Sequence, residues 1–157
     1  MQKIAVFVDV QNIYYTTRQT YGRQFNYRKL WQHLLLQGNV VTAYAYAIDK
    51  GDDQQRKFQD ALKHIGFDVK LKPFIQRSDG SAKGDWDVGI ALDAIELAEN
   101  VDTIVLVSGD GDFEILVERI KQRFGKKVEV YGVPGLTAQN LIDSASKFVP
   151  IEKDFLL

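Results

Sequence analysis

The sequence predicts an α/β fold in which a mostly parallel, doubly wound sheet carries helices on its faces. Short apolar segments rich in β-forming residues alternate along the chain with longer segments whose apolar residues recur every three or four positions. This alternation favours right-handed βαβ crossovers, which make neighbouring strands parallel. Ligands bind such sheets beyond the carboxyl ends of the strands, near the point where the strand order reverses. The residues that follow the strands are therefore the first candidates for function.

Each predicted strand is a short apolar run bounded by polar or turn residues. The first run is apolar at every position, which is typical of a strand buried on both faces, and it ends at Asp9. The last run is expected to be an edge strand. In chain order, the predicted strands are residues 4–8, 40–48, 67–71, 103–107, 127–131 and 148–151.

The predicted helices have capping residues at several of their ends. Asn26 and Asp52 are expected to cap helices that Gly38 and Gly66 end, and Gly125 is expected to end a third. Counted from cap to terminating residue, the predicted helices are residues 26–38, 52–66, 87–98, 113–125 and 136–145. In the helix predicted over residues 87–98, the side chains of residues 88, 91, 92 and 95 are expected in the core. Residues 10–25 and 73–84 are expected to be loops.

Length and composition indicate one globular domain over residues 1–157. Of the 157 residues, 45% are hydrophobic and 26% are charged, and Lys plus Arg (20) nearly balance Asp plus Glu (21). A nucleic-acid partner would therefore be held by a local basic patch rather than by net charge. The absence of Cys excludes disulfides, thiolate zinc sites and Cys nucleophiles. We expect a cytoplasmic protein that does not enter a membrane and that is a monomer or homodimer.

Several aspartates stand where the predicted strands end. Asp9 ends the first strand, Asp110 and Asp112 follow residues 103–107, and Asp87 begins the helix before them. If these two strands are neighbours, the carboxylates converge. Two charges about 4 Å apart repel by roughly 4 kcal/mol at an effective dielectric of 20, so such a cluster needs cations. Oxygen ligands suit Mg²⁺ or Mn²⁺, which can activate water for hydrolysis of a phosphodiester.

Some of these acids have a simpler interpretation. Residues 108–112 could form an ordinary turn in which Asp112 caps the next helix without any metal. Asp9 is harder to explain in this way, because burying a carboxylate without a partner costs several kcal/mol. Asp93 lies six residues beyond Asp87, which is a rise of about 9 Å and a turn of about 240° along a helix. We therefore expect Asp93 outside any site that Asp87 forms.

Three ordered motifs lie at these strand ends and helix starts: DVQN at residues 9–12, KGDWD at 83–87 and SGDGDF at 108–113. Together they resemble the motifs of the NYN domain family of PIN-like nucleases, and specifically its LabA-like branch. The resemblance covers essentially the whole chain. It implies a Rossmann-like, three-layer PIN-like fold with a central, mostly parallel sheet. It also implies a metal-dependent ribonuclease or related nuclease. We expect this activity to use Mg²⁺ or Mn²⁺ and to act mainly on single-stranded RNA, with single-stranded DNA as an alternative substrate.

The resemblance also assigns residues to the site. The matching acids are Asp9, Asp87, Asp110 and Asp112, and Asn12 occupies the position of a polar partner. Relatives often have one residue between the glycine and the acid of the second motif, whereas two intervene here, so Asp85 or Asp87 fits as the inner metal ligand. The spacing favours Asp87, which begins a helix. The residues expected to contact substrate are Tyr14, Arg18, Arg77, Lys83 and Ser108.

Other functions remain to be compared with this one. A non-catalytic regulatory module could keep the same acidic pocket to bind a metal or nucleic acid, and the fold does not decide between the two. A phospho-acceptor receiver domain is excluded, because residues 71–73 (LKP) supply no acceptor Asp at the end of the third strand. A haloacid-dehalogenase phosphatase would need Asp-x-Asp where this chain has residues 9–11 (DVQ).

Overall fold

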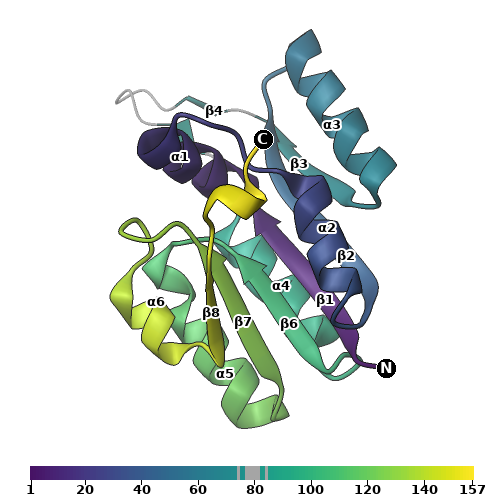
Figure 1. Cartoon of the computed structure of the whole chain (residues 1–157), viewed down its shortest axis with the longest axis vertical. Coiled ribbons are helices and arrows are strands. Elements are labelled where there is room, and N and C mark those ends of the chain that lie inside the picture. The colour runs from purple at the N-terminus through teal and green to yellow at the C-terminus, as the bar shows by residue number, and fades with distance from the viewer. Residues whose placement is uncertain (74, 77–81, 84) are drawn as a thin grey trace.

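A six-stranded parallel sheet forms the centre of the molecule, with helices on both faces (Figure 1). The computed structural model describes residues 1–73, 75–76, 82–83 and 85–157, with backbone only at 73, 75–76 and 82–83. Every strand pair in this sheet is parallel, which confirms the predicted fold class. In their order across the sheet, the strands are β3 (Asp68–Pro73), β2 (Asn39–Asp49), β1 (Lys3–Asp9), β6 (Thr103–Val107), β7 (Lys127–Gly132) and β8 (Lys147–Pro150). A separate antiparallel pair consists of β4 (Ile75–Gln76) and β5 (Ala82–Lys83).

Alternate side chains of β1 serve two different cores, which explains the continuous apolar run. Ile4, Val6 and Val8 pack in the core under one set of helices, whereas Ala5 and Phe7 pack in the core on the other face. The first core contains side chains of α1 (Val10–Tyr21), α2 (Tyr27–Leu35) and α3 (Asp53–Ile65), and of the short helix η2 (Lys153–Phe155). The second contains side chains of α4 (Asp87–Ala98), η1 (Gly111–Phe113), α5 (Glu114–Phe124) and α6 (Gln139–Ser144).

Several predicted helix ends are confirmed in detail. The Asn26 side chain accepts a hydrogen bond from the Lys29 amide (3.1 Å), and the Asp52 side chain accepts one from the Gln55 amide (2.7 Å). Gly125 ends α5 with φ of 64°, a left-handed conformation that glycine adopts without steric cost.

The predicted loop after Asp9 is wrong, because residues 10–21 form the helix α1. Its buried stripe is narrow and consists of Val10, Ile13 and Thr17. A polar residue therefore occupies one of the core positions, and the Thr17 hydroxyl is satisfied by donating to the Ile13 carbonyl (2.7 Å). The helix begins directly after the last residue of β1, so no turn signal separates the two elements.

The face that α4 buries also differs from the prediction. Ile90, Ala94 and Ala98 are buried, whereas Val88 and Leu92 of the predicted core stripe are 70% and 59% exposed. The helix is apolar on almost every side, so its hydrophobic spacing did not identify the inward face. Ala94 and Ala98 pack in the same core as Ala5 and Phe7 of β1.

The strand order reverses between β1 and β6, so the condition for the carboxylates to converge is met. The chain runs outward from β1 to β2 and β3, and α4 then leads back to β6 on the other side of β1. Val8 pairs with Val107, so Asp9 and Ser108 follow neighbouring strands at the carboxyl edge of the sheet.

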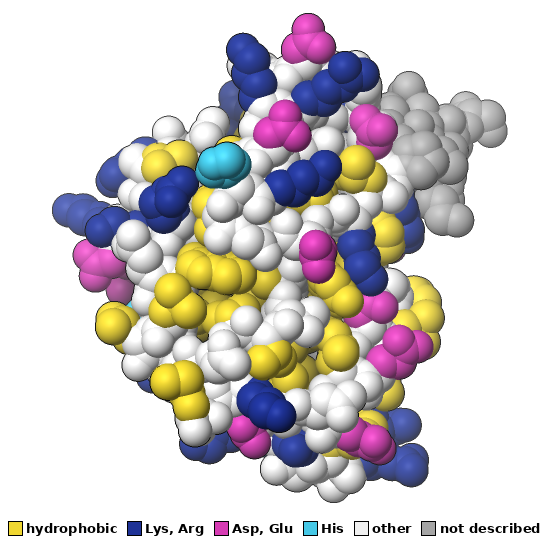
Figure 2. All heavy atoms as spheres, turned by 90° about the vertical axis from the view of Figure 1, so that its right-hand side faces the viewer, with side chains coloured by type: hydrophobic (Ala, Val, Ile, Leu, Met, Phe, Trp, Pro, Cys, Tyr) yellow, Lys and Arg dark blue, Asp and Glu magenta, His cyan; other side chains and the backbone are white. Residues whose placement is uncertain are grey.

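Charges of both signs are interspersed on the face that carries α2 and α3 (Figure 2), in keeping with the net charge of −1. That face therefore presents no broad field of one sign that would attract a polyanion. Within the described part of the chain, no helix is both long and apolar enough to cross a bilayer.

Candidate metal centre

The carboxyl ends of β1 and β6 open into an acidic hollow of about 320 Å³. Its lining residues are Asp9, Gln11, Asn12, Tyr15, Thr16, Asp85, Asp87 and Asp110. Asp87, Asp110 and Asp112 each offer a carboxylate oxygen, and these oxygens all lie within 4.8 Å of one another. The structure thus gathers the acids of all three sequence motifs at one edge of the sheet.

Asp9 is the most deeply buried acid of the group, with 8% of its surface exposed. Its Oδ2 accepts a hydrogen bond from the Ser108 hydroxyl (3.0 Å), and its Oδ1 accepts a longer one from the Asn12 amide (3.5 Å). Burial raises the pKa of Asp9 to about 6, although these two hydrogen bonds oppose the shift. The negative charges of Asp110 and Asp85 raise that pKa further.

The loop after β6 is fixed to α1 by a second hydrogen bond. The Gly109 amide donates to Oδ1 of Asn12 (2.9 Å), which holds the backbone before Asp110 against the helix that follows Asp9. Gly109 has no room for a side chain, because a Cβ there would lie 2.5 Å from the Leu136 carbonyl oxygen. Asn12 therefore helps to position the loop that carries Asp110 and Asp112.

Asp110, rather than Asp112, caps the turn that follows β6. Its Oδ1 accepts a hydrogen bond from the Asp112 amide (2.9 Å) at the start of η1. The simpler interpretation of this motif was therefore right about a cap and wrong about the residue. The cap uses one oxygen of Asp110, and an oxygen of this residue also belongs to the group shared with Asp87 and Asp112.

Asp87 is the first residue of α4 and does not cap it as the sequence predicted, since the cap position is Trp86 and has no side-chain hydrogen bond. Burial raises the pKa of Asp87 to about 7, and the charges of Asp110, Asp85 and Asp9 add to the shift. Carboxylates that repel one another in this way are stabilised by a bound cation. The described residues that line the hollow offer oxygen donors and no basic side chain, a donor set that fits Mg²⁺ or Mn²⁺.

Trp86 anchors the segment that carries Asp85 and Asp87. Its Nε1–H donates to the Ala47 carbonyl (2.9 Å), and its ring lies against Tyr46 with centroids 5.2 Å apart. Lys72 stands over the Trp86 ring (4.5 Å) and donates to the Asp85 carbonyl (3.0 Å). Asp85 and Asp87 thus flank a side chain that is tied to β2.

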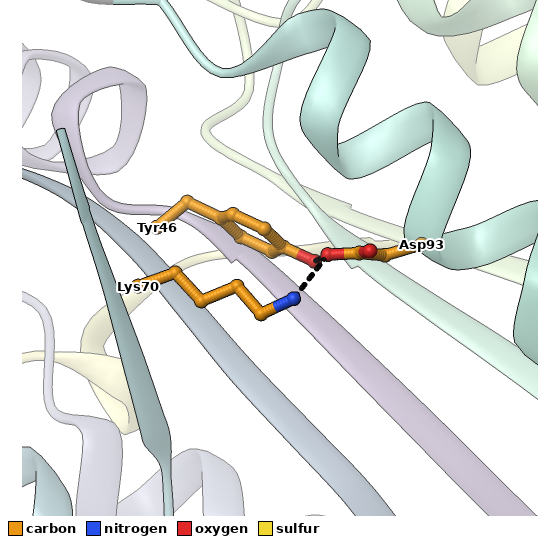
Figure 3. Close-up of polar contacts among 3 residues, drawn as sticks. All are labelled: Tyr46, Lys70 and Asp93. Carbon is orange, nitrogen blue, oxygen red and sulfur yellow. Dashed lines mark hydrogen bonds and ion pairs between the residues drawn. The ribbon is translucent and has the colours of Figure 1, made fainter.

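Asp93 lies farther along α4 and binds two other strands (Figure 3). Its Oδ2 accepts hydrogen bonds from the Tyr46 hydroxyl of β2 and from the Lys70 ammonium group of β3, both at 2.7 Å. The Lys70 nitrogen also lies 4.1 Å from the centre of the Tyr44 ring. Asp93 therefore holds α4 to the strands rather than lining the acidic hollow.

Replacement of Asp93 by Ala should destabilise the protein by about 2 kcal/mol, because Tyr46 and Lys70 lose a shared acceptor in a partly buried setting. Urea unfolding measures the loss. Glu96→Ala, an exposed position on the same helix, should change the free energy of unfolding by less than about 0.5 kcal/mol. Equal effects of the two substitutions would contradict an anchoring role.

The residues predicted to contact substrate are distributed unevenly. Tyr14 and Arg18 lie on the exposed side of α1, and Arg18 Nη1 donates to the Tyr14 hydroxyl (2.6 Å). Ser108 is fully buried, and its hydroxyl donates to Oδ2 of Asp9. Arg77 and the side chain of Lys83 lie outside the described residues.

Three lining residues that were not assigned to the site lie on α1. Gln11, Tyr15 and Thr16 contribute to the wall of the hollow next to Asn12. Positions 11 and 15, like 12 and 16, are four apart and share one face of a helix. Recognition of residues 10–21 as a helix would have identified them.

The family is shown by comparison with known proteins. The model of the NYN domain matches residues 3–152. The chain belongs to the NYN domain family. NYN domains are part of the PIN-like nuclease superfamily, and this membership, together with an acidic cluster able to hold a metal ion, supports a nuclease-like function.

Individual relatives agree with this assignment. "Low amplitude and bright protein LabA" of Synechococcus elongatus is 30% identical over 95% of this chain and 83% of its own length. An uncharacterized protein of Methanocaldococcus jannaschii is 35% identical over 70% of this chain, a match that spans 42% of that protein. A crystal structure of a protein of unknown function from Vibrio parahaemolyticus superposes with a TM-score of 0.95 at 60% identity, over 99% of this chain and 96% of that one.

Proposed function

We propose that this NYN domain is a metal-dependent nuclease that hydrolyses phosphodiester bonds, with single-stranded RNA as its main substrate. One observation carries the proposal: carboxylate oxygens of Asp87, Asp110 and Asp112 lie within 4.8 Å of one another, beside the buried Asp9. Such a group is costly without a cation, and it stands at the strand-order reversal, where α/β sheets bind ligands.

The proposed roles follow from the surroundings of each residue. Asp87, Asp110 and Asp112 hold Mg²⁺ or Mn²⁺, and Asp85 and Asp9 add negative charge to the same hollow. The bound ion supplies Lewis-acid stabilisation of the phosphate and lowers the pKa of a water molecule. Ser108 fixes the carboxylate of Asp9, and Asn12 fixes the Gly109 backbone, so that the acids keep their relative positions.

The proposal also includes the extent of the domain, its cellular location, its oligomeric state and its nucleic-acid partner. We infer that residues 1–157 act as one domain, in the cytoplasm, as a monomer or homodimer. RNA is the expected partner and single-stranded DNA the second substrate to be compared with it. We expect no cleavage in the absence of a divalent metal ion.

Cleavage assays with the purified protein test the proposal. Labelled single-stranded RNA, duplex RNA and single-stranded DNA are incubated with Mg²⁺, Mn²⁺ or EDTA. We expect cleavage of the single-stranded RNA that requires the metal. Asp110→Asn should lower its rate by at least about 100-fold, since loss of a residue that only supports a metal ligand already costs about 10- to 100-fold.

Asp60→Asn is the matched control. Asp60 is an exposed acid on α3 and does not line the hollow, and its substitution removes the same charge as Asp110→Asn. The Asp60→Asn variant should cleave like the wild type. Equal traces of cleavage by the wild type and Asp110→Asn would identify a contaminant and remove the support for an enzyme. Metal-dependent binding of RNA without cleavage would instead identify a non-catalytic module.

A further inference from the structure

The aromatic residues near the hollow fall into two groups with different environments. Tyr21, Phe25 and Tyr27 tie the chain to the core: the Tyr21 hydroxyl donates to the Ile151 carbonyl (2.6 Å), and the other two are 5% and 8% exposed. Tyr14 and Tyr15 are 43% and 53% exposed. Packing thus accounts for the first group and leaves the two tyrosines of α1 unexplained.

Tyr15 stands at the acidic site itself. It lines the same hollow as Asp87 and Asp110, so a ligand held by these acids through a metal lies next to a half-exposed aromatic ring. A Tyr side chain presents a large planar surface and loses little conformational freedom on binding, because it has only two rotatable bonds before its hydroxyl.

Neighbouring side chains hold this surface in place. The rings of Tyr14 and Tyr15 meet edge to face, with centroids 5.4 Å apart and planes at 75°. Arg18 lies one turn farther along α1, where it bonds the Tyr14 hydroxyl and stands 5.7 Å from the centre of that ring. The exposed side of α1 therefore carries two aromatic rings in mutual contact and one positive charge, and of these only Tyr15 lines the hollow.

We propose that Tyr15 is a base-binding residue, which stacks on an unpaired nucleobase next to the phosphate held at the acidic cluster. The inference rests on the proposed nuclease function and names the part of the substrate that α1 recognises. Tyr14 and Arg18 continue the surface toward the neighbouring nucleotide, with the guanidinium group close to its phosphate.

The chemistry of the hollow favours a nucleotide over other occupants. Its carboxylates repel an anion unless a cation lies between them. A nucleotide carries both groups that this site could bind: a phosphate that can contact the cation and a planar base that can stack on the Tyr15 ring. An unpaired base offers its face to an aromatic side chain, whereas a base in a duplex is covered by its neighbours. Tyr15 thus gives a physical reason for a preference for single strands with little dependence on base identity, since every base has such a face.

Binding of a labelled RNA octamer tests the inference. Fluorescence anisotropy is measured with Ca²⁺ in place of Mg²⁺, for the wild type, Tyr15→Ala, Tyr15→Phe and the control Gln19→Ala, an exposed position on the same helix. Removal of one stacked base contact typically weakens binding by about 5- to 150-fold. We expect Tyr15→Ala to weaken binding within this range, and Tyr15→Phe and Gln19→Ala to bind like the wild type.

An abasic scan identifies the contact directly. Removal of the base at one position of the octamer should weaken binding to the wild type and leave binding to Tyr15→Ala unchanged, because both changes remove the same stacking contact. A 2-aminopurine at that position should lose fluorescence on binding the wild type and keep it with Tyr15→Ala. Equal unfolding midpoints of the variants in urea show that the fold is intact.

The outcomes separate this inference from the nuclease proposal. Wild-type binding by Tyr15→Ala, or an equal abasic penalty in both proteins, would overturn the role of Tyr15 even where the wild type cleaves RNA. A wild-type protein that neither binds nor cleaves any strand with any divalent metal would overturn both.

Discussion

Asp9→Asn is expected to stabilise the metal-free protein by about 2 to 3 kcal/mol at pH 8, while it removes metal-dependent cleavage. The pKa of Asp9 is raised from 3.8 to about 6, so its charge costs the folded state roughly 3 kcal/mol at a pH above both values. Asparagine keeps the shape of the side chain. Its side-chain oxygen can accept from the Asn12 amide and its NH₂ group can donate to the Ser108 oxygen, so a hydrogen bond to each partner remains, although the one to Ser108 reverses direction.

Urea unfolding in EDTA measures this gain. Asp110→Asn should give a smaller one, because Asp110 is less buried than Asp9 and its carboxylate caps η1. Asp60→Asn should have little effect. A metal-free Asp9→Asn protein that is less stable than the wild type would mean that this carboxylate is compensated inside the fold, and the argument for a cation at the hollow would fail.

The stability of the metal-free protein should fall by about 3 to 5 kcal/mol between pH 4 and pH 8 through Asp9 and Asp87 alone. Their folded-state pKa values are raised to about 6 and about 7, so between those pH limits the folded state holds more protons than the unfolded state. Stability is therefore highest when both are protonated and is lost as pH rises through the raised pKa values. Partial exposure of Asp87 reduces its share of the effect.

The difference between the wild type and Asp9→Asn/Asp87→Asn, measured by urea unfolding from pH 4 to pH 8 in EDTA, isolates this contribution. Saturating Mn²⁺ should abolish the fall, because the ion replaces the protons. Calorimetry at pH 6 in buffers of different ionisation enthalpy should accordingly detect proton release on binding. The same pH dependence in the double variant would assign the effect to other groups.

The sequence predicted the sheet and the acidic site well because both depend on strong local signals. Two continuous apolar runs identified β1 and β6 as buried strands, and the rule for ligand sites in parallel sheets then selected the residues after them. The pairing of Val8 with Val107 confirmed that these strands are neighbours. The convergence of Asp9 with Asp110 in one hollow followed.

The errors arose where tertiary contacts override local preference. Residues 14–17 (YYTT) are aromatic or β-branched and favour helix only weakly, yet they lie in α1 because Ile13 and Thr17 pack into the core. In α4, apolar residues on several sides concealed the face that packs on the sheet. Asp85 and Asp87, of which the spacing favours Asp87, both line the hollow, on either side of an anchored Trp86.

The hydrogen bonds from Ser108 to Asp9 and from Gly109 to Asn12 join residues 99 and 97 positions apart in the chain. The acidic centre therefore cannot assemble during synthesis until β6 and the loop after it have left the ribosome and β6 has paired with β1. Before that moment β1 has an open edge, and the nascent chain has Asp9 without the acids of residues 110 and 112. The metal binding proposed above therefore requires that β6 has paired with β1, and a chain that ends before β6 lacks the assembled centre.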